Sequence, residues 1–151
     1  MFKINDFARR FYESNLSKLP AENRAKKYLI DRGFTKEVVD VFNIGYATDS
    51  WDELSSAIDK QKVPLETAAR LGLVKARTSG KGHYDIFRDR IIFPILNHKS
   101  EYVGFGGRII DDGQPKYLNS PESEVFHKGK TFYGLFEAAK YIRTEDQVIV
   151  V

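Results

Sequence analysis

Residues 104–108, GFGGR, combine three glycines with an arginine in a stretch otherwise typical of a β-strand. Glycine has no side chain, so a ligand can approach the backbone closely there. A guanidinium can bind a phosphate through two parallel hydrogen bonds, which predicts a phosphate contact at Arg108. A bulged strand with a solvated arginine explains the same residues. The residues alone leave both interpretations open.

Residues 115–129, PKYLNSPESEVFHKG, are a second candidate for binding chemistry. Lys116 and Lys128 can each place a positive charge beside a phosphate, and the Asn119 amide can bond to a sugar or a base. The alternative is an ordered surface loop that is anchored by its own aromatic and aliphatic side chains. Physical reasoning on the segment alone slightly favours this alternative.

The sequence shows no pattern typical of a metal site or of covalent catalysis. The three histidines stand alone, without the spacing of metal ligands; they are His83, His98 and His127. Asp111 and Asp112 precede a glycine, which favours a turn. There are no cysteines, which excludes disulfides and thiolate metal sites. We therefore expect no catalytic residue and no metal ligand in this sequence.

The composition suits one globular domain or a piece of a larger one, with 151 residues, 42% hydrophobic and 30% charged. There is no secretory signal at Met1 and no apolar run that could span a bilayer, so we expect a cytoplasmic protein. The net charge of +3 names no partner. Basic residues outnumber acidic ones in 1–34 and 75–130, but solvated lysines explain this as simply as a polyanion groove does.

The elements that must position these residues begin with a mainly helical half, residues 1–74. Apolar residues recur there with a period close to 3.6, and capping residues mark the helix ends. The expected helices are 4–19, 21–33 (ended by Gly33), 36–42 (capped by Thr35), one that starts at a capping box in 50–53, and 65–71 (starting after Pro64 and ended by Gly72).

The sequence pattern of the second half, from residue 75 onward, predicts mainly strands. Residues 75–85 read as an exposed, mobile loop, and 86–134 read mainly as strands and ordered loops. The expected elements are strands at 90–96 and 102–110, a hairpin connection at 97–101, a turn at 111–114 and a helix at 135–143. Pro94 places the first of these strands at an edge or a bulge. The fold class is α+β, a helical half followed by a mostly antiparallel twisted sheet.

Residues 147–151, QVIVV, predict a short strand buried on both faces, as in a parallel sheet. A protein would rarely stop after such a strand. We therefore expect the sequence to be cut at a domain boundary, or one strand into the next domain.

Several long segments in series resemble the signature motifs of bacterial replicative DNA primase of the DnaG type. They are RDRIIFPI (88–95), VGFGGR (103–108), PKYLNSPES (115–123) and FHKGKTFYGLFEA (126–138), with YLIDRGF (28–34) and FNIGYA (42–47) upstream. A series of such motifs in the right order is far more specific than a lone glycine pattern. The resemblance covers nearly the whole sequence.

This resemblance implies that residues 1–143 are the N-terminal subdomain of the primase RNA-polymerase domain. Residues 144–151 would then begin a truncated TOPRIM domain, in which the family places an acidic motif directly after the apolar strand. It also implies a basic groove for the template and the incoming nucleotide. Its members by position are Arg32, Arg108, Lys116, Asn119 and Lys128, with Tyr117 and Arg88 as further candidates.

The family synthesises short RNA primers on single-stranded DNA. The resemblance implies Mg²⁺ or Mn²⁺ held by TOPRIM carboxylates outside this sequence, and Zn²⁺ in a separate N-terminal domain. It implies ribonucleoside triphosphates, an RNA–DNA hybrid product and the replicative helicase as partners, with the helicase bound by a C-terminal domain, and a nucleoid-associated cytoplasmic location. This sequence alone would make no primer. The alternatives are a non-enzymatic binding module of a replication protein and a phage or plasmid primase–helicase.

Overall fold

A computed structural model describes residues 1–149, and residues 150–151 lie outside the described part. The helices are α1 (Phe2–Lys18), α2 (Arg24–Asp31), α3 (Lys36–Val41), α4 (Glu53–Lys60), α5 (Leu65–Arg70) and α6 (Leu135–Glu145). The strands are β1 (Gly45–Ala47), β2 (Val74–Ala76), β3 (His83–Asp85), β4 (Arg90–Leu96), β5 (Tyr102–Ile109) and β6 (Tyr117–Asn119), and a short 3-10 turn covers Lys128–Lys130. No described helix is long and apolar enough to cross a membrane.

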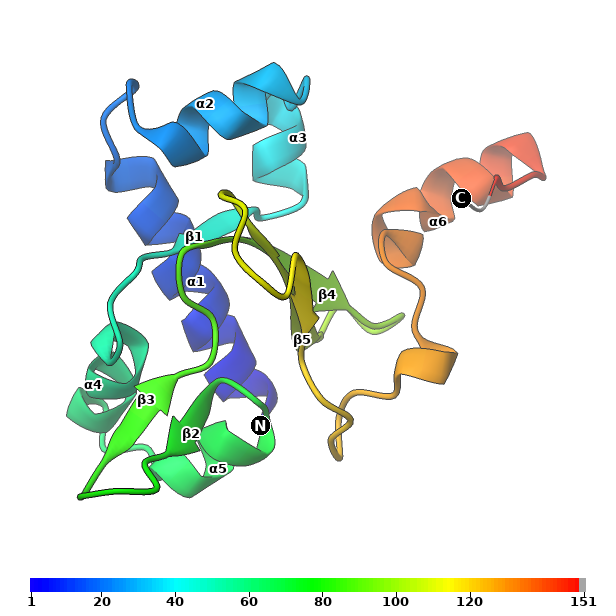
Figure 1. Cartoon of the computed structure of the whole chain (residues 1–151). Helices are drawn as coiled ribbons and strands as arrows, with labels where there is room; N and C mark the ends of the chain where they lie inside the picture. The colour runs from blue at the N-terminus through cyan, green and yellow to red at the C-terminus, as the bar shows by residue number, and fades with distance from the viewer. Residues whose placement is uncertain (150–151) are drawn as a thin grey trace.

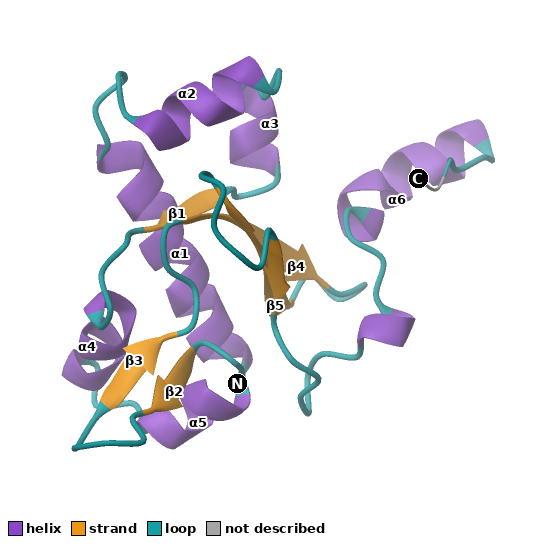
Figure 2. Ribbon diagram, viewed as in Figure 1, coloured by secondary structure: helices purple, strands orange, loops and turns teal. Residues whose placement is uncertain are grey.

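The strands form two antiparallel sheets, which confirms the predicted α+β class. The larger sheet has the order β1–β4–β5–β6, and β2 pairs with β3 in a separate hairpin. Figure 1 shows α4, α5 and this hairpin gathered at one end of α1, with α2 and α3 at the other end. In Figure 2 the larger sheet lies between these groups, and α6 stands apart from the other helices.

Helix α1 packs on one face of the larger sheet, and Tyr12 lies at the centre of this contact. The Tyr12 ring is 2% exposed and meets Phe105 edge-on, with 5.7 Å between the ring centroids. The helix approaches β1 so closely that a Cβ atom at Gly45 would lie 2.6 Å from the carbonyl carbon of Tyr12. Glycine is therefore required at position 45, because any side chain would collide with the helix backbone.

The N-terminus of α4 is capped by a residue far away in the sequence, and the predicted capping box in 50–53 is wrong. The Asp85 carboxylate, from β3, accepts hydrogen bonds from the amides of Leu54 and Ser55 at 2.7 and 2.8 Å. Glu53 instead accepts a hydrogen bond from the Thr48 hydroxyl. Burial raises the pKa of Asp85, although the two amide donors oppose the shift. A tertiary contact thus replaces the local cap.

Three other expectations need correction. The predicted loop at 75–85 contains paired strands, because its ends join β2 and β3, and the exposed turn is limited to 77–82. Residues 117–119, expected to lie in a loop, form strand β6 because β5 offers them a free edge. Residues 147–149 form no strand and have no strand partner, and the rest of the predicted strand at 147–151 lies outside the described residues.

The prediction for Pro94 is confirmed. Strand β1 pairs with β4 only as far as Ile92, so that side of Pro94 has no neighbouring strand. The missing amide hydrogen of proline therefore costs no ladder bond there. The register between β4 and β5 shifts just beyond, between Ile95 and Leu96.

Asp85→Ala should lower the free energy of unfolding by about 2 kcal/mol, because two buried amides at the start of α4 lose their acceptor. Asp85→Asn keeps one acceptor oxygen and should cost less. Urea denaturation measures both. Asp59→Ala, at an exposed position on the same helix, is the control. An equal cost for Asp59→Ala and Asp85→Ala would contradict the capping role.

Gly45→Ala should destabilise the protein by about 2 kcal/mol, because the added methyl group overlaps the α1 backbone, which cannot move aside without displacing Tyr12. The matched control is Gly129→Ala, since nothing lies within 4 Å of a Cβ atom there. Thermal unfolding followed by circular dichroism compares the two variants. A normal melting temperature for Gly45→Ala would refute the close approach of α1.

Candidate nucleic-acid interface

The candidate site lies on the face of the larger sheet that points away from α1. Successive side chains alternate between faces along a strand, so Gly106 and Arg108 lie opposite to the core residue Phe105. Pairing with β6 places Gly106 beside Asn119 and Arg108 beside Tyr117. Two of the predicted contacts in β6 therefore share a face with the predicted arginine of β5.

A pocket of about 350 Å³ opens on this face. Its lining combines aromatic side chains with a few polar ones: Phe93, Ile95, Gly106, Gly107, Tyr117, Asn119, Phe126, Lys128, Thr131 and Tyr133. Three of the predicted binding residues, Tyr117, Asn119 and Lys128, are thus brought together. A mostly apolar pocket with a few convergent polar groups is the usual form of a ligand site.

The glycines of β5 serve the fold as well as the pocket. A Cβ atom at Gly107 would lie 2.7 Å from the buried ring of Phe87, and one at Gly104 would lie 3.0 Å from the ring of Phe126. At Gly106 the nearest atom would be Oδ1 of Asn119, at 3.2 Å. Gly106 is therefore the glycine of this strand whose missing side chain leaves room beside a predicted binding residue.

Arg108 and Arg32 lie around one aromatic ring at the edge of this face. The guanidinium carbon of Arg108 is 5.3 Å from the ring centroid of Tyr28, and that of Arg32 is 5.4 Å from the same centroid. Arg108 also lies over Tyr117, at 4.9 Å, and donates a hydrogen bond to the Tyr117 hydroxyl. Tyr117 thus connects the arginines to the pocket.

Two of the remaining candidates lie outside the pocket lining. Lys116 is exposed and directly precedes β6. Arg88 lies over the ring of Trp51 at 4.1 Å and donates to the carbonyl of Asp85, so the structure places it against the group of α4, α5 and the β2–β3 hairpin, here called the α4 lobe. Its partners there account for the Arg88 side chain without a nucleic acid.

Arg90 has a structural contact of its own, on the inner side of β4. Its side chain is 5% exposed and donates to the carbonyl of Pro115 at 2.9 Å. Burial, followed by the charge of Arg88, lowers the pKa of Arg90. This bond ties β4 to the start of the segment that carries β6.

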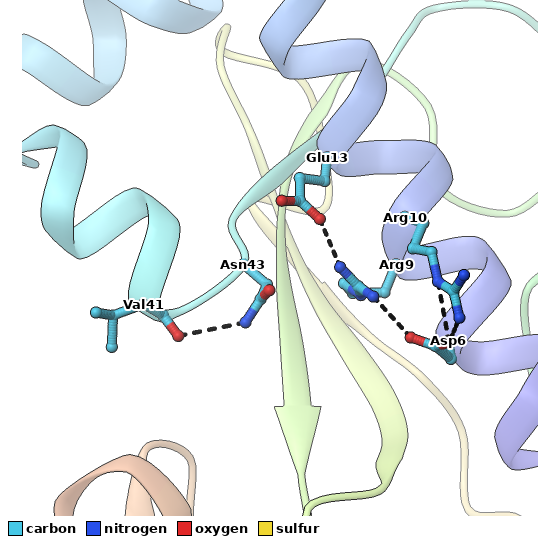
Figure 3. Close-up of polar contacts among 6 residues, drawn as sticks. All are labelled: Asp6, Arg9, Arg10, Glu13, Val41 and Asn43. Atoms are coloured by element: carbon cyan, nitrogen blue, oxygen red, sulfur yellow. Dashed lines mark hydrogen bonds and ion pairs between the residues drawn. The ribbon is translucent and has the colours of Figure 1, made fainter.

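Several basic residues elsewhere are already neutralised by carboxylates. On α1, Arg9 pairs with Asp6 at 2.8 Å and with Glu13 at 2.5 Å, and Arg10 also pairs with Asp6 (Figure 3). The excess of basic residues in 1–34 is therefore not a free positive surface along this helix. Each of these pairs is local to α1, between residues three or four apart.

Arg24 is neutralised by residues distant in sequence. Its guanidinium pairs with Asp89 and with Asp111, and Asp89 also accepts a hydrogen bond from Tyr46 at 2.7 Å. Burial, together with this bond, raises the pKa of Tyr46 to about 12. The network ties α2 to the residues that flank β4 and β5.

The cations of the candidate site, like most lysines and arginines of residues 1–149, have no such carboxylate partner, and they lie on or beside one face of the larger sheet. Within residues 1–149, no carboxylate lies within ion-pairing distance of their charged groups. These cations are Arg32, Arg108, Lys116 and Lys128. A surface that keeps several cations without internal counter-ions is complementary to a polyanion.

The profile of the family described as "DNA primase catalytic core, N-terminal domain" matches residues 11–139. A DNA primase of Halalkalibacterium halodurans is 43% identical over 150 residues, which cover 99% of this chain and 25% of that protein. A DNA primase of Pseudomonas aeruginosa is 38% identical over 151 residues, covering 100% of this chain and 23% of that protein. This chain belongs to the DNA primase catalytic-core family.

Solved structures of the family share the fold. The E. coli primase catalytic core has a TM-score of 0.86 at 35% identity, covering 93% of this chain and 44% of that one. The RNA polymerase domain of Mycobacterium tuberculosis DnaG, bound to a DNA duplex with an overhang, has a TM-score of 0.90 at 29% identity, covering 99% and 47%. A DnaG catalytic domain bound to single-stranded DNA has a TM-score of 0.85 at 35% identity, covering 93% and 44%. The chain spans about a quarter of the length of its curated primase relatives.

Sequence reasoning missed part of the lining of this pocket. Tyr133 is half exposed and stacks on Phe42 at 5.9 Å, while its ring meets Phe93 edge-on at 6.3 Å. Tyr133 follows the FHKG motif closely in the sequence, which was the signal available for it. No sequence pattern indicated Phe93 as a pocket residue, because an aromatic residue in an apolar strand is typical of a buried core position.

Arg24→Gln should lower the free energy of unfolding by about 1 kcal/mol, because it removes two partly exposed ion pairs that join α2 to the sheet. Lys128→Gln should leave the free energy unchanged, because the Lys128 ammonium has no carboxylate partner. Urea denaturation at low and high salt compares the two variants. The loss at Arg24 should shrink in high salt, and a cost at Lys128 as large as that at Arg24 would contradict this assignment of charges.

Proposed function

We propose that this chain forms the template- and nucleotide-binding part of a DNA primase, an enzyme that makes short RNA primers on single-stranded DNA. The observation that carries the proposal is the set of cations without internal counter-ions beside an aromatic pocket. Family membership supports it, and so does the similar DnaG catalytic domain that was solved with single-stranded DNA. The whole protein would also take ribonucleoside triphosphates and yield an RNA–DNA hybrid.

Each predicted residue except Arg88 receives a role from its position in the site. Arg32, Arg108 and Lys128 neutralise phosphates of the template or of the incoming nucleotide. Asn119, at the pocket wall, bonds to a sugar or a base edge. Tyr117 offers its ring beside the pocket, where a base can stack on it. Lys116, exposed next to β6, adds charge along the path of the strand.

The metal-dependent chemistry belongs elsewhere in the protein. Nucleotidyl transfer uses metal ions held by clustered carboxylates. Among residues 1–149, no group of three or more histidines or carboxylates is placed to hold a metal. The donors of these residues therefore do not fit a Mg²⁺ or Mn²⁺ site, and we assign that site to a TOPRIM part of the protein outside residues 1–143.

Further parts of the protein complete the proposal. The structure of Aquifex aeolicus primase contains a zinc-binding domain together with an RNA polymerase domain, which supports a separate zinc domain in this protein as well. A C-terminal domain that binds the replicative helicase and a nucleoid-associated cytoplasmic location follow from the same family role.

The double variant Lys116→Ala with Lys128→Ala should weaken binding of a single-stranded oligonucleotide by the complete protein and reduce primer yield. Loss of two phosphate contacts should make the log–log salt slope shallower by about 1.4. Fluorescence anisotropy over a range of NaCl concentrations measures the slope.

The control for this experiment removes the same charge from the α4 lobe. It combines Lys60→Ala, at the end of α4, with Lys75→Ala in β2. It should leave both affinity and slope unchanged. A wild-type protein without salt-dependent binding would refute the proposed function. Normal binding by the Lys116/Lys128 variant would refute only the assignment of these two lysines.

A further inference from the structure

Tyr28 has no role in the binding set proposed above, yet its ring touches two members of that set. The guanidinium carbons of Arg32 and Arg108 lie 5.4 and 5.3 Å from its centroid, within the range of a cation–π contact. We propose that Tyr28 is a positioning residue that holds these two arginines together as a clamp for adjacent phosphates of one strand. The inference rests on the proposed function and adds a residue to it.

The two arginines repel each other in the absence of a ligand. Their guanidinium carbons are no farther apart than the sum of their distances to the shared ring, which exceeds the screening length of about 8 Å at physiological salt, so at that limit the repulsion is weak and grows as the salt concentration is lowered. Within the described residues neither arginine forms an ion pair that would offset this repulsion. Arg24, on the same helix as Tyr28, shows the opposite arrangement, with two carboxylates around one guanidinium. An anion bound between Arg32 and Arg108 would relieve the repulsion.

The Tyr28 ring is well placed to hold the pair because it is itself fixed. Tyr28 is half buried and packs against the hydrophobic cluster that includes Leu29 and Ile91, so the core sets its orientation. Arg32 lies four residues later, as the C-cap residue of α2, and its backbone N–H still donates to the carbonyl of Tyr28 at 3.1 Å, which keeps it on the same side of the helix. The helix itself ends at Asp31, and Gly33, directly after Arg32, adopts a φ of +78°.

Arg108 reaches the same ring from β5. One of its terminal nitrogens donates to the Tyr117 hydroxyl, and its Nε–H is buried without a hydrogen-bond partner. A buried donor without a partner costs stability. The buried Arg90 of β4 differs from Arg108 here, because its guanidinium donates a hydrogen bond to the carbonyl of Pro115. The Arg108 side chain is thus held by two aromatic rings and one hydroxyl, and its second terminal nitrogen, which is not among the buried unpaired atoms, is left for a ligand.

Tyr28→Leu in the complete protein should weaken binding of a labelled single-stranded oligonucleotide about three- to tenfold, since two guanidiniums lose their platform. The salt slope should become shallower by about 0.7 to 1.4, the loss of one or two phosphate contacts. Tyr28→Phe keeps the ring face and should bind within about twofold of the wild type. Tyr84→Leu removes a tyrosine beneath Arg88 in the other lobe and should leave affinity and slope unchanged.

A double-mutant cycle separates positioning from a structural role. In a background of Arg32→Gln with Arg108→Gln, Tyr28→Leu should have no further effect on affinity. If Tyr28→Leu does not fold, Tyr28→pentafluorophenylalanine reverses the charge distribution of the ring at nearly the same size, and it should show the same loss of affinity.

The outcomes distinguish this inference from the proposed function. Wild-type protein without salt-dependent binding would overturn both. Wild-type binding with an unchanged affinity and slope in Tyr28→Leu would overturn only the role of Tyr28. An equal loss from Tyr28→Leu in the wild-type and in the arginine-depleted background would also overturn it, because Tyr28 would then act without the two arginines.

Discussion

The alternation of side chains along β5 is the constraint on which the rest of the structure depends. Phe105 points to one face and packs against Tyr12 of α1, so Gly106 and Arg108 must point to the other. Strand β6 pairs with β5 in a register that adds Tyr117 and Asn119 to the same face. One buried aromatic contact therefore determines which residues can reach a ligand.

Within residues 1–149, carboxylates pair with only a few of the lysines and arginines. Arg9 pairs with carboxylates of its own helix α1, and Arg24 pairs with carboxylates that flank β4 and β5, so the charges of both are neutralised within the fold. The cations around the pocket have none within the described residues and are held instead by aromatic rings and backbone position. Rings orient a guanidinium without neutralising it, because the ring carries no net charge. A site for a polyanion requires this combination of fixed direction and retained charge.

Much of the fold could be predicted from the sequence because its signals are local. Period, capping residues and glycine stops placed α1, α2 and α3, and β-branched runs placed β4 and β5. The failures share a cause. The cap of α4 comes from Asp85, thirty residues away, and β6 exists because β5 has a free edge. No local pattern carries either contact.

The sequence by itself determined the family and the residue types of the site, because motifs such as VGFGGR and PKYLN are long and specific. Only the tertiary structure decided which of those residues meet. It placed Tyr117, Asn119 and Lys128 at one pocket, and it placed Arg88 against Trp51 in another lobe. It also brought Arg108 of β5 to the ring of Tyr28, which Arg32 contacts from the end of α2. Such contacts depend on packing and register, which arise from the whole chain.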